Sequence, residues 1–373
     1  MKIAILGSGN GGCTAAADWA LLGHEVYLWD FEQFKDNIAG INAKGGIQAQ
    51  GAIEGFGKLA YAGHDLQKTL NQADFIQVIG PAYATDAFAK ACKPYLKKGQ
   101  IVCVSPSSGA GAIKFKNALG VNIEDDSFII SEISTLPYAC RVKTPGEVEV
   151  FLKLTGGLYL AALPAKYTEK VYDIFKLAYP RASMANSLFM TMLQTGNTII
   201  HPSVTLLNAG RIESTKGDFY FYEDGATPAT GRLMEALDNE KLVLSDVLEA
   251  GIIRDIKIKL DQGYNAEESY ETGYRTAPGF KGIKAQSNLD TRYMNEDVGY
   301  GLVFISDLGR RFGVPTPVTD AVILIASIVM KRDYKKEAAL TLSSLGLGDY
   351  SLEQLKALFN RPSTSPGKAT VSG

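Results

Sequence analysis

The stretch Ile3–Gly12, which reads IAILGSGNGG, decides the fold of this chain. Four apolar residues typical of a buried strand precede the pattern GxGxxG, and an Ala-rich helical stretch follows it. In this context Gly7 permits a tight turn, Gly9 lets a pyrophosphate approach the backbone, and Gly12 allows close helix packing. The N–H groups at the start of the helix would bind the phosphates. The predicted cofactor-binding residues of this loop are Gly7, Gly9, Asn10, Gly11 and Gly12. The alternative is a tight glycine turn that binds nothing.

From this unit to about Ala178, short apolar runs alternate with stretches of helical spacing. Such alternation predicts a Rossmann-type, doubly wound α/β domain, with helices on both faces of a parallel sheet. The turn Thr144–Gly146 lies between two alternating stretches and predicts a hairpin that closes the sheet, before a last helix over Thr168–Tyr179. The expected strands are Ile3–Leu6, Val26–Trp29, Phe75–Ile79, Ile101–Val104 and Phe128–Ile133.

Beyond about Arg181 the strand signals nearly vanish, and the remaining chain predicts an all-α carboxyl-terminal domain. We therefore expect a dinucleotide-binding domain over residues 1–181 and a helical substrate domain over 182–360. Residues 361–373, rich in Ser, Thr, Pro and Gly, predict a disordered tail. The expected long helices are Leu188–Ile200, Leu233–Leu248, Tyr300–Phe312 and Thr319–Arg332.

Composition excludes several classes of function. The 373 residues contain 38 Lys and Arg against 40 Asp and Glu, a net charge of −2, which disfavours binding to nucleic acid or to anionic membranes. Only four apolar residues precede Gly7, and the longest apolar run, Ala321–Met330, is half the length that a bilayer requires, so we expect a cytoplasmic protein without a membrane segment. The four cysteines lack metal-ligand spacing, which predicts reduced, buried thiols and no metal site.

An acidic residue at the end of the second strand bears on the choice of cofactor. Asp30 lies about 20 residues past the glycines, where its carboxylate can accept hydrogen bonds from the adenosine ribose and would repel a 2′-phosphate. Only Lys35 is basic nearby, so we expect NAD(H) to be preferred over NADP(H); alternatively, Asp30 caps the next helix. The loops Gly80–Ala82, which contains Pro81, and Ser105–Gly111 follow later strands and are expected beside the nicotinamide, although ordinary turns share their composition.

Hydride transfer to a carbonyl or imine usually requires a proton donor, and the chain has three histidines. His24 and His64 resemble solvated turn residues. His201 ends an apolar helical stretch just before Pro202, which should break or kink the helix. Asn197 lies one turn earlier on the same face, so both side chains can face one cavity. We therefore expect His201 to be catalytic; the alternative is a satisfied core histidine.

A polar cluster, Asn288–Asp297, precedes the next apolar stretch. Arg292 could bind a carboxylate through two hydrogen bonds, and Asp297 could orient an imidazole and stabilise its charge. The alternative is a solvated loop before a helix.

Five segments together resemble the octopine/nopaline (opine) dehydrogenase family, over nearly the whole chain to about Gly348. They are GSGNGG at 7–12, EISTLPYACR at 132–141, HPSVTLLNAGRIE at 201–213, FYFYEDGATP at 219–228 and NLDTRYMNED at 288–297. The resemblance implies substrates bound between a Rossmann-type domain and a helical domain. It also implies reductive condensation of an amino acid with a 2-oxo acid through an imine, with NAD(P)H as reductant, to give an N-(carboxyalkyl) amino acid.

The resemblance also implies roles for individual residues. His201 matches the catalytic histidine of the family, and Asp297 matches an acidic partner that would favour the protonated imidazole. Arg292 and Asn197 fall on family positions, and Thr205 lies in the block that begins at His201. These three residues are predicted substrate contacts. Arg141 is a predicted second carboxylate anchor, although it could be a structural residue of the hairpin.

Two other functions compete with this one. Glycerol-3-phosphate and hydroxyacid dehydrogenases share such an amino-terminal domain, but many of them use a lysine that Leu188–Ile200 lacks. The second competing function is that of a non-catalytic NAD(H) sensor. The expected partners are small-molecule substrates, and a homodimer is compatible with the resemblance.

Overall fold

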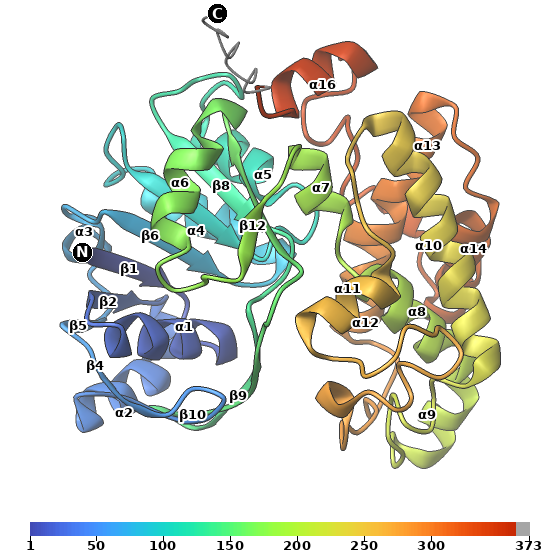
Figure 1. Ribbon diagram of the computed structural model, residues 1–373, viewed down its shortest axis with the longest axis horizontal. Coiled ribbons are helices and arrows are strands. Elements are labelled where there is room, and N and C mark those ends of the chain that lie inside the picture. The colour runs from blue at the N-terminus through green and yellow to red at the C-terminus, as the bar shows by residue number, and fades with distance from the viewer. Residues whose placement is uncertain (363–373) are drawn as a thin grey trace, which may run out of the picture.

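The computed structural model describes residues 1–362, which form two lobes (Figure 1). The first lobe contains two β-sheets with their helices, and the second is almost entirely helical. The predicted Rossmann-type α/β domain and all-α carboxyl-terminal domain are therefore confirmed. Of the predicted tail, residues 363–373 lie outside the described residues, and the N–H of Arg361 donates a hydrogen bond to the carbonyl of Asn186.

The large sheet has the strand order β12-β11-β8-β7-β6-β1-β2-β5. The strands from β8 to β5 in this order are parallel, whereas β11 runs antiparallel to β8. The five predicted strands are present, each to within one residue. The last strand, β12, follows Arg181, so the sheet includes residues beyond the predicted domain boundary. The bounds are β1 Lys2–Leu6, β2 Glu25–Trp29, β5 Tyr61–Gly63, β6 Phe75–Ile79, β7 Ile101–Ser105, β8 Ile129–Ile133, β11 Leu158–Leu163 and β12 Ala182–Met184.

Alternation along β1 divides the core of the first domain between the two faces of the sheet. Ile3 and Ile5 pack into the core under α1 (Asn10–Leu21) and α6 (Thr168–Phe175). The intervening Ala4 and Leu6 pack into the core under α4 (Thr85–Cys92) and α5 (Gly111–Leu119). This second core continues into the helical domain. Helices α2 (Lys35–Lys44) and α3 (Leu66–Leu70) complete this domain.

The predicted hairpin is present as β9 (Tyr138–Thr144) and β10 (Glu147–Lys153), but it does not close the large sheet. It belongs to a second sheet of order β4-β3-β10-β9, with β3 at Gly46–Gly51 and β4 at Gly55–Lys58. The prediction was wrong because β10 pairs in parallel with β3, a Gly- and Gln-rich strand in which Ile47 is the one β-branched residue. Helix α1 lies between the two sheets.

The helical domain contains the predicted long helices, with one exception. Leu188–Ile200 forms two helices instead of one, separated by the turn 194–196. Helix α16 packs back on α7, with 5.0 Å between the ring centroids of Phe189 and Phe359. The bounds are α7 Leu188–Leu193, α8 Asn197–Leu207, α9 Ala209–Thr215, α10 Pro228–Leu248, α11 Asp255–Gln262, α12 Arg292–Asn295, α13 Val303–Phe312, α14 Pro317–Met330, α15 Tyr334–Glu337 and α16 Leu352–Phe359.

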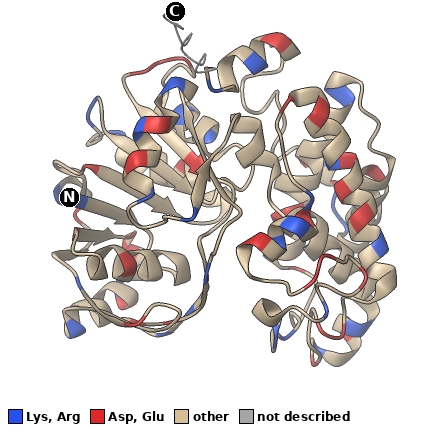
Figure 2. Ribbon diagram, in the orientation of Figure 1, with Lys and Arg blue, Asp and Glu red and all other residues tan. Residues whose placement is uncertain are grey.

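The surface chemistry of the fold agrees with the near-neutral composition. In the view of Figure 2, acidic and basic residues are interspersed over both lobes. Among residues 1–362, no helix is long and apolar enough to cross a membrane. All four cysteines are free; Cys13, Cys92 and Cys103 are buried as predicted, whereas Cys140 is only half-buried.

The glycine loop between β1 and α1 has little space for side chains except at one position. Gly7 has φ +114°, and a Cβ there would lie 2.3 Å from the carbonyl oxygen of Ile79. A Cβ on Gly12 would lie 1.8 Å from the carbonyl oxygen of Gly7, so α1 can start here only without a side chain. At Gly9 a Cβ would meet no atom within 4 Å. Helix α1 has no acidic residue in its first turn and no side-chain cap, so its amino terminus is open to an anion.

This geometry predicts opposite effects for two alanine substitutions. Gly12→Ala should lower the free energy of unfolding by about 1–3 kcal/mol, because the methyl group forces α1 away from β1. Gly9→Ala should leave stability nearly unchanged but weaken NADH binding, because its methyl group enters the space expected for the pyrophosphate. Urea unfolding and fluorescence titration with NADH measure the two effects. Unchanged NADH affinity in the Gly9→Ala variant would contradict the predicted phosphate position.

Candidate active site

Helix α8 carries His201 into the interior of the helical domain. The helix starts at Asn197, directly after Gly196, which packs so closely against Asp255 that a Cβ would lie 2.1 Å from its Oδ1. It continues past Pro202 to Leu207, so the predicted break at this proline is wrong. Pro202 is the sixth residue of α8, so its missing N–H removes the intrahelical hydrogen bond to the carbonyl of Thr198, while the helix continues on both sides of it.

The imidazole of His201 contacts three side chains. Its Nδ1 lies 2.7 Å from Oδ2 of Asp297, and its Nε2 lies 3.2 Å from the hydroxyl of Tyr222. The ring of Tyr293 stacks on it, with 3.7 Å between centroids and 6° between planes. His201 is 3% exposed and Asp297 7% exposed, so their hydrogen bond lies in a nearly dry environment. The structure therefore brings together the two predicted catalytic residues.

Burial decides the charge of this histidine. It lowers the pKa of His201 below the ordinary value, and the attraction of Asp297 offsets only part of that effect. Asp297 thus favours the protonated imidazole, as expected, but desolvation outweighs its effect on the pKa. In the neutral ring, Nδ1 donates its hydrogen to Asp297, which leaves Nε2 as a hydrogen-bond acceptor for Tyr222. Burial also raises the pKa of Tyr222 well above its usual value, so this hydroxyl keeps its proton.

Asp297 reaches His201 because a wide turn packs closely against α8. After α12 the chain forms a π-helical turn, Asp297–Leu302, before α13 begins. Such turns are rare and frequently occur at functional sites. Within it, a Cβ on Gly301 would lie 2.2 Å from Cγ2 of Thr198, so this glycine allows the turn to contact the first turn of α8.

The predicted substrate contacts surround this centre. Asn197 and Thr205 lie one turn before and after His201 on α8, and thus share its face. Thr205 is buried, and its hydroxyl has no hydrogen-bond partner among the described residues. The charge of Arg292 acts to lower the pKa of His201, and its side chain is 59% exposed. The exposed Arg141, on β9, partly offsets the burial that raises the pKa of Tyr293.

Tyr222, Tyr293 and Glu296 were not assigned roles from the sequence. All three lie in segments that carry the family resemblance, which is the one signal that could have pointed to them. Glu296 is 8% exposed, and its Oε1 accepts a hydrogen bond of 3.1 Å from the N–H of Ala82. Lys114 Nζ donates a hydrogen bond of 2.7 Å to the carbonyl of Ala82. The loop after β6 is thus held from both sides, and Glu296 joins it to the segment that contains Asp297.

The residues predicted to bind the cofactor lie along the carboxyl edge of the large sheet. Asp30 ends β2 beside the glycine loop, where Oδ2 accepts hydrogen bonds of 2.6 Å from both the N–H and the hydroxyl of Ser8. The side chain of Asp30 does not cap the helix that follows, because α2 has no side-chain hydrogen bond at its N-cap. Asn10 Oδ1 accepts from the N–H of Val142 at 2.9 Å and so ties α1 to β9. Pro81 starts the loop that Glu296 holds.

Comparison with known proteins bears on the identity of the chain. The family model described as NAD/NADP octopine/nopaline dehydrogenase, alpha-helical domain, matches residues 184–330. The model for the amino terminus of NAD-dependent glycerol-3-phosphate dehydrogenase matches residues 2–114.

Similar proteins match over almost their whole length. The opine dehydrogenase of Arthrobacter sp. (strain 1C) is 33% identical over 92% of this chain and 94% of its own. Among solved structures, the complex of octopine dehydrogenase with NADH and L-arginine has a TM-score of 0.73 at 19% identity, covering 94% and 99% of the two chains. The complex with NADH and pyruvate has a TM-score of 0.71 at the same identity and coverage. NADP⁺-bound yersinopine dehydrogenase has a TM-score of 0.68 at 15% identity, covering 96% and 97%.

The matched helical domain contains His201 and Asp297, and the Arthrobacter relative spans both domains. The chain belongs to the octopine/nopaline (opine) dehydrogenase family.

Proposed function

We propose that this protein condenses an amino acid with a 2-oxo acid through an imine and reduces the product with NADH to an N-(carboxyalkyl) amino acid. As a member of its family, the chain is an NAD-dependent oxidoreductase. Solved relatives hold NADH with L-arginine or with pyruvate, an amino acid and a 2-oxo acid. The observation that carries the proposal is the buried contact of His201 with Asp297 and Tyr222.

The neutral imidazole suits a proton acceptor. An amino group must lose its proton before it attacks a carbonyl carbon, and Nε2 of His201 is free to take that proton once a substrate displaces the hydroxyl of Tyr222. Asp297 keeps the ring oriented and stabilises the imidazolium that forms. Tyr222 can donate its proton in a hydrogen bond to an oxygen of the substrate. The bound nicotinamide would supply the hydride.

Two substrates with carboxylates require cationic contacts. We assign one to Arg292, close to His201, and the other to Arg141, which faces the same region from the hairpin. Asn197 and the unpartnered hydroxyl of Thr205 complete the contacts from α8. The side chains that select the amino acid and the oxo acid lie in this region, between the two domains.

The first test assays NADH oxidation by the wild type and by His201→Asn over a matrix of amino acids and 2-oxo acids. Wild-type NADH oxidation should require both an amino acid and a 2-oxo acid. The variant should lose about 10²–10⁴-fold in kcat, because no base accepts the proton, with NADH affinity nearly unchanged. His24→Asn, a change in a histidine packed on Trp19, is the matched control and should remain active. Oxidation of NADH by a single oxo acid without an amine would contradict the proposal and favour a hydroxyacid dehydrogenase.

The pH dependence tests the charge of His201. In the direction of product oxidation, kcat/KM should fall as the pH drops through the pKa of His201, which lies below its ordinary value. Asp297→Asn removes the charge that raises this pKa, so the acidic limb should move to still lower pH, with a lower plateau. Asp218→Asn, at an exposed ion pair with Lys284, is the control. An acidic limb at the same pH in wild type and Asp297→Asn would remove His201 as the titrating base.

For the cofactor, we propose that Asp30 makes NADH preferred over NADPH. Its carboxylate is held beside the glycine loop by Ser8, and a 2′-phosphate on the ribose would bring a second negative charge toward it. The open amino terminus of α1 and the free space at Gly9 suit the pyrophosphate.

Asp30→Asn tests this preference with the shape of the side chain retained. The ratio of kcat/KM for NADPH to that for NADH should rise on the order of tenfold, because the repulsive charge is gone. Asp36→Asn, an exposed aspartate in the first turn of α2, is the control. The same ratio in wild type and Asp30→Asn would show that another residue sets the preference.

A further inference from the structure

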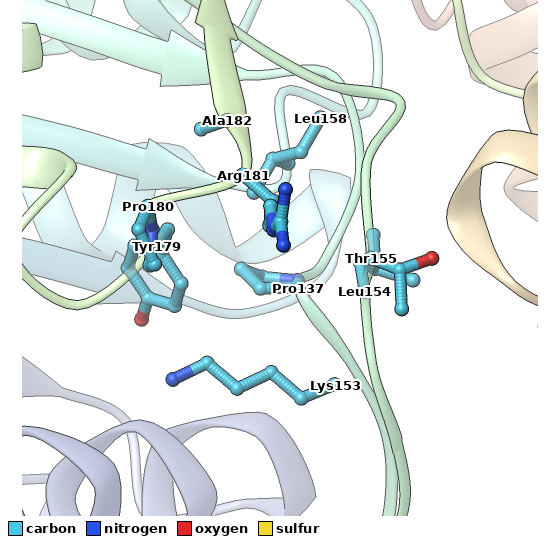
Figure 3. A pocket seen from close by; sticks show the side chains of 9 residues that line it. All are labelled: Pro137, Lys153, Leu154, Thr155, Leu158, Tyr179, Pro180, Arg181 and Ala182. Atoms are coloured by element: carbon cyan, nitrogen blue, oxygen red, sulfur yellow. The ribbon is translucent and has the colours of Figure 1, made fainter.

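A cavity of about 500 Å³ opens on the first domain, away from the residues described above (Figure 3). It lies where the end of the hairpin, the start of β11 and the segment before β12 meet. Its apolar walls include Leu154, Leu158 and Pro180, and its cations are Lys153 and Arg181. None of the predicted catalytic, substrate or cofactor residues lines it. Its volume falls within the range of about 300–1,000 Å³ that is usual for small-molecule sites.

The two cations are not equivalent. Lys153 Nζ lies 2.7 Å from Oδ2 of Asp18, which is buried, so this charge is already neutralised inside the protein. The guanidinium of Arg181 points into the cavity, as Figure 3 shows, and no carboxylate of residues 1–362 lies within ion-pair distance of it. Tyr179 does not supply an acceptor there, because its hydroxyl is hydrogen-bonded to Tyr138 and Gln77 inside the core. The cavity therefore carries one uncompensated positive charge.

We propose that this cavity binds a small organic carboxylate that carries an apolar group, at a site separate from the substrate cleft. A planar guanidinium matches a carboxylate through two parallel hydrogen bonds, which fixes the anionic end of the ligand at Arg181. The side chains of Leu154, Leu158 and Pro180 then contact its hydrocarbon part.

The position of the cavity couples such a ligand to the contact between the domains. Thr155, which lines it, donates its hydroxyl to the carbonyl of Asp261 at 2.9 Å, and its N–H to the carbonyl of Gln262 at 3.3 Å. Gln262 Nε2 in turn donates to the carbonyl of Gly157 at 3.0 Å. A ligand in the cavity would therefore lie directly beside the hydrogen bonds that attach α11 to the first domain.

Calorimetric titration of the full chain with hexanoate tests the proposal. Hexanoate has a carboxylate and an apolar chain but no amino or oxo group, and hexanamide is the neutral match. We expect saturable binding of hexanoate only, weakened about tenfold or more in Arg181→Gln through loss of the charged hydrogen bonds. Arg181→Lys, which keeps the charge without the planar fork, should weaken binding less. Arg232→Gln on α10, where the arginine pairs with Glu271 on the surface, should bind hexanoate like the wild type.

The substrate cleft is also expected to attract carboxylates, so Arg292→Gln separates the two sites. Hexanoate affinity should be retained in this variant. Loss of binding in Arg292→Gln, wild-type affinity in both Arg181 variants, or no saturable binding to the wild type would each overturn the proposal. Thermal unfolding without ligand verifies that every variant is folded. The readout is binding, so it does not depend on the proposed reaction.

Discussion

The hydrogen bond between His201 and Asp297 is the contact around which the candidate active site is built. It joins α8 to a π-helical turn across 96 positions of sequence, and it forms because Gly301 lets the turn approach the first turn of α8. Both side chains are nearly inaccessible to solvent, so the energetic cost of charging the imidazole is high. The carboxylate reduces this cost without cancelling it. The result is an oriented imidazole whose pKa lies below its ordinary value.

Hydrogen bonds also connect the two domains close to Asp297. Glu296, next to Asp297 in the chain, accepts the N–H of Ala82, and Lys114 binds the carbonyl of that residue. Within the first domain, Asn10 at the start of α1 accepts the N–H of Val142 in the hairpin. The loop expected to lie beside the nicotinamide is therefore attached to the residue next to Asp297. Movement of one domain relative to the other would change the cofactor site and the proton-transfer site together.

Much of the architecture could be predicted from local pattern. The parallel strands stand out because each is a short apolar run that is buried on both faces. The glycine loop has a conformation that matches the roles predicted for Gly7 and Gly12. The second sheet was not predictable in this way. Its strand β3 is held by pairing with β10, about 100 residues away, and not by the preferences of its own residues.

The candidate site could likewise be predicted only in part from the sequence. The sequence alone determined which residue types are available: one histidine in the helical domain, an aspartate in a polar block, and glycines between a strand and a helix. Tertiary structure decided that His201 and Asp297 touch, that Tyr222 and Tyr293 complete their surroundings, and that Glu296 reaches across to Ala82. It also determined the direction in which the pKa of His201 shifts. A carboxylate partner can be inferred from a motif, but desolvation depends on every atom packed around the ring, and these atoms come from segments that only folding brings together.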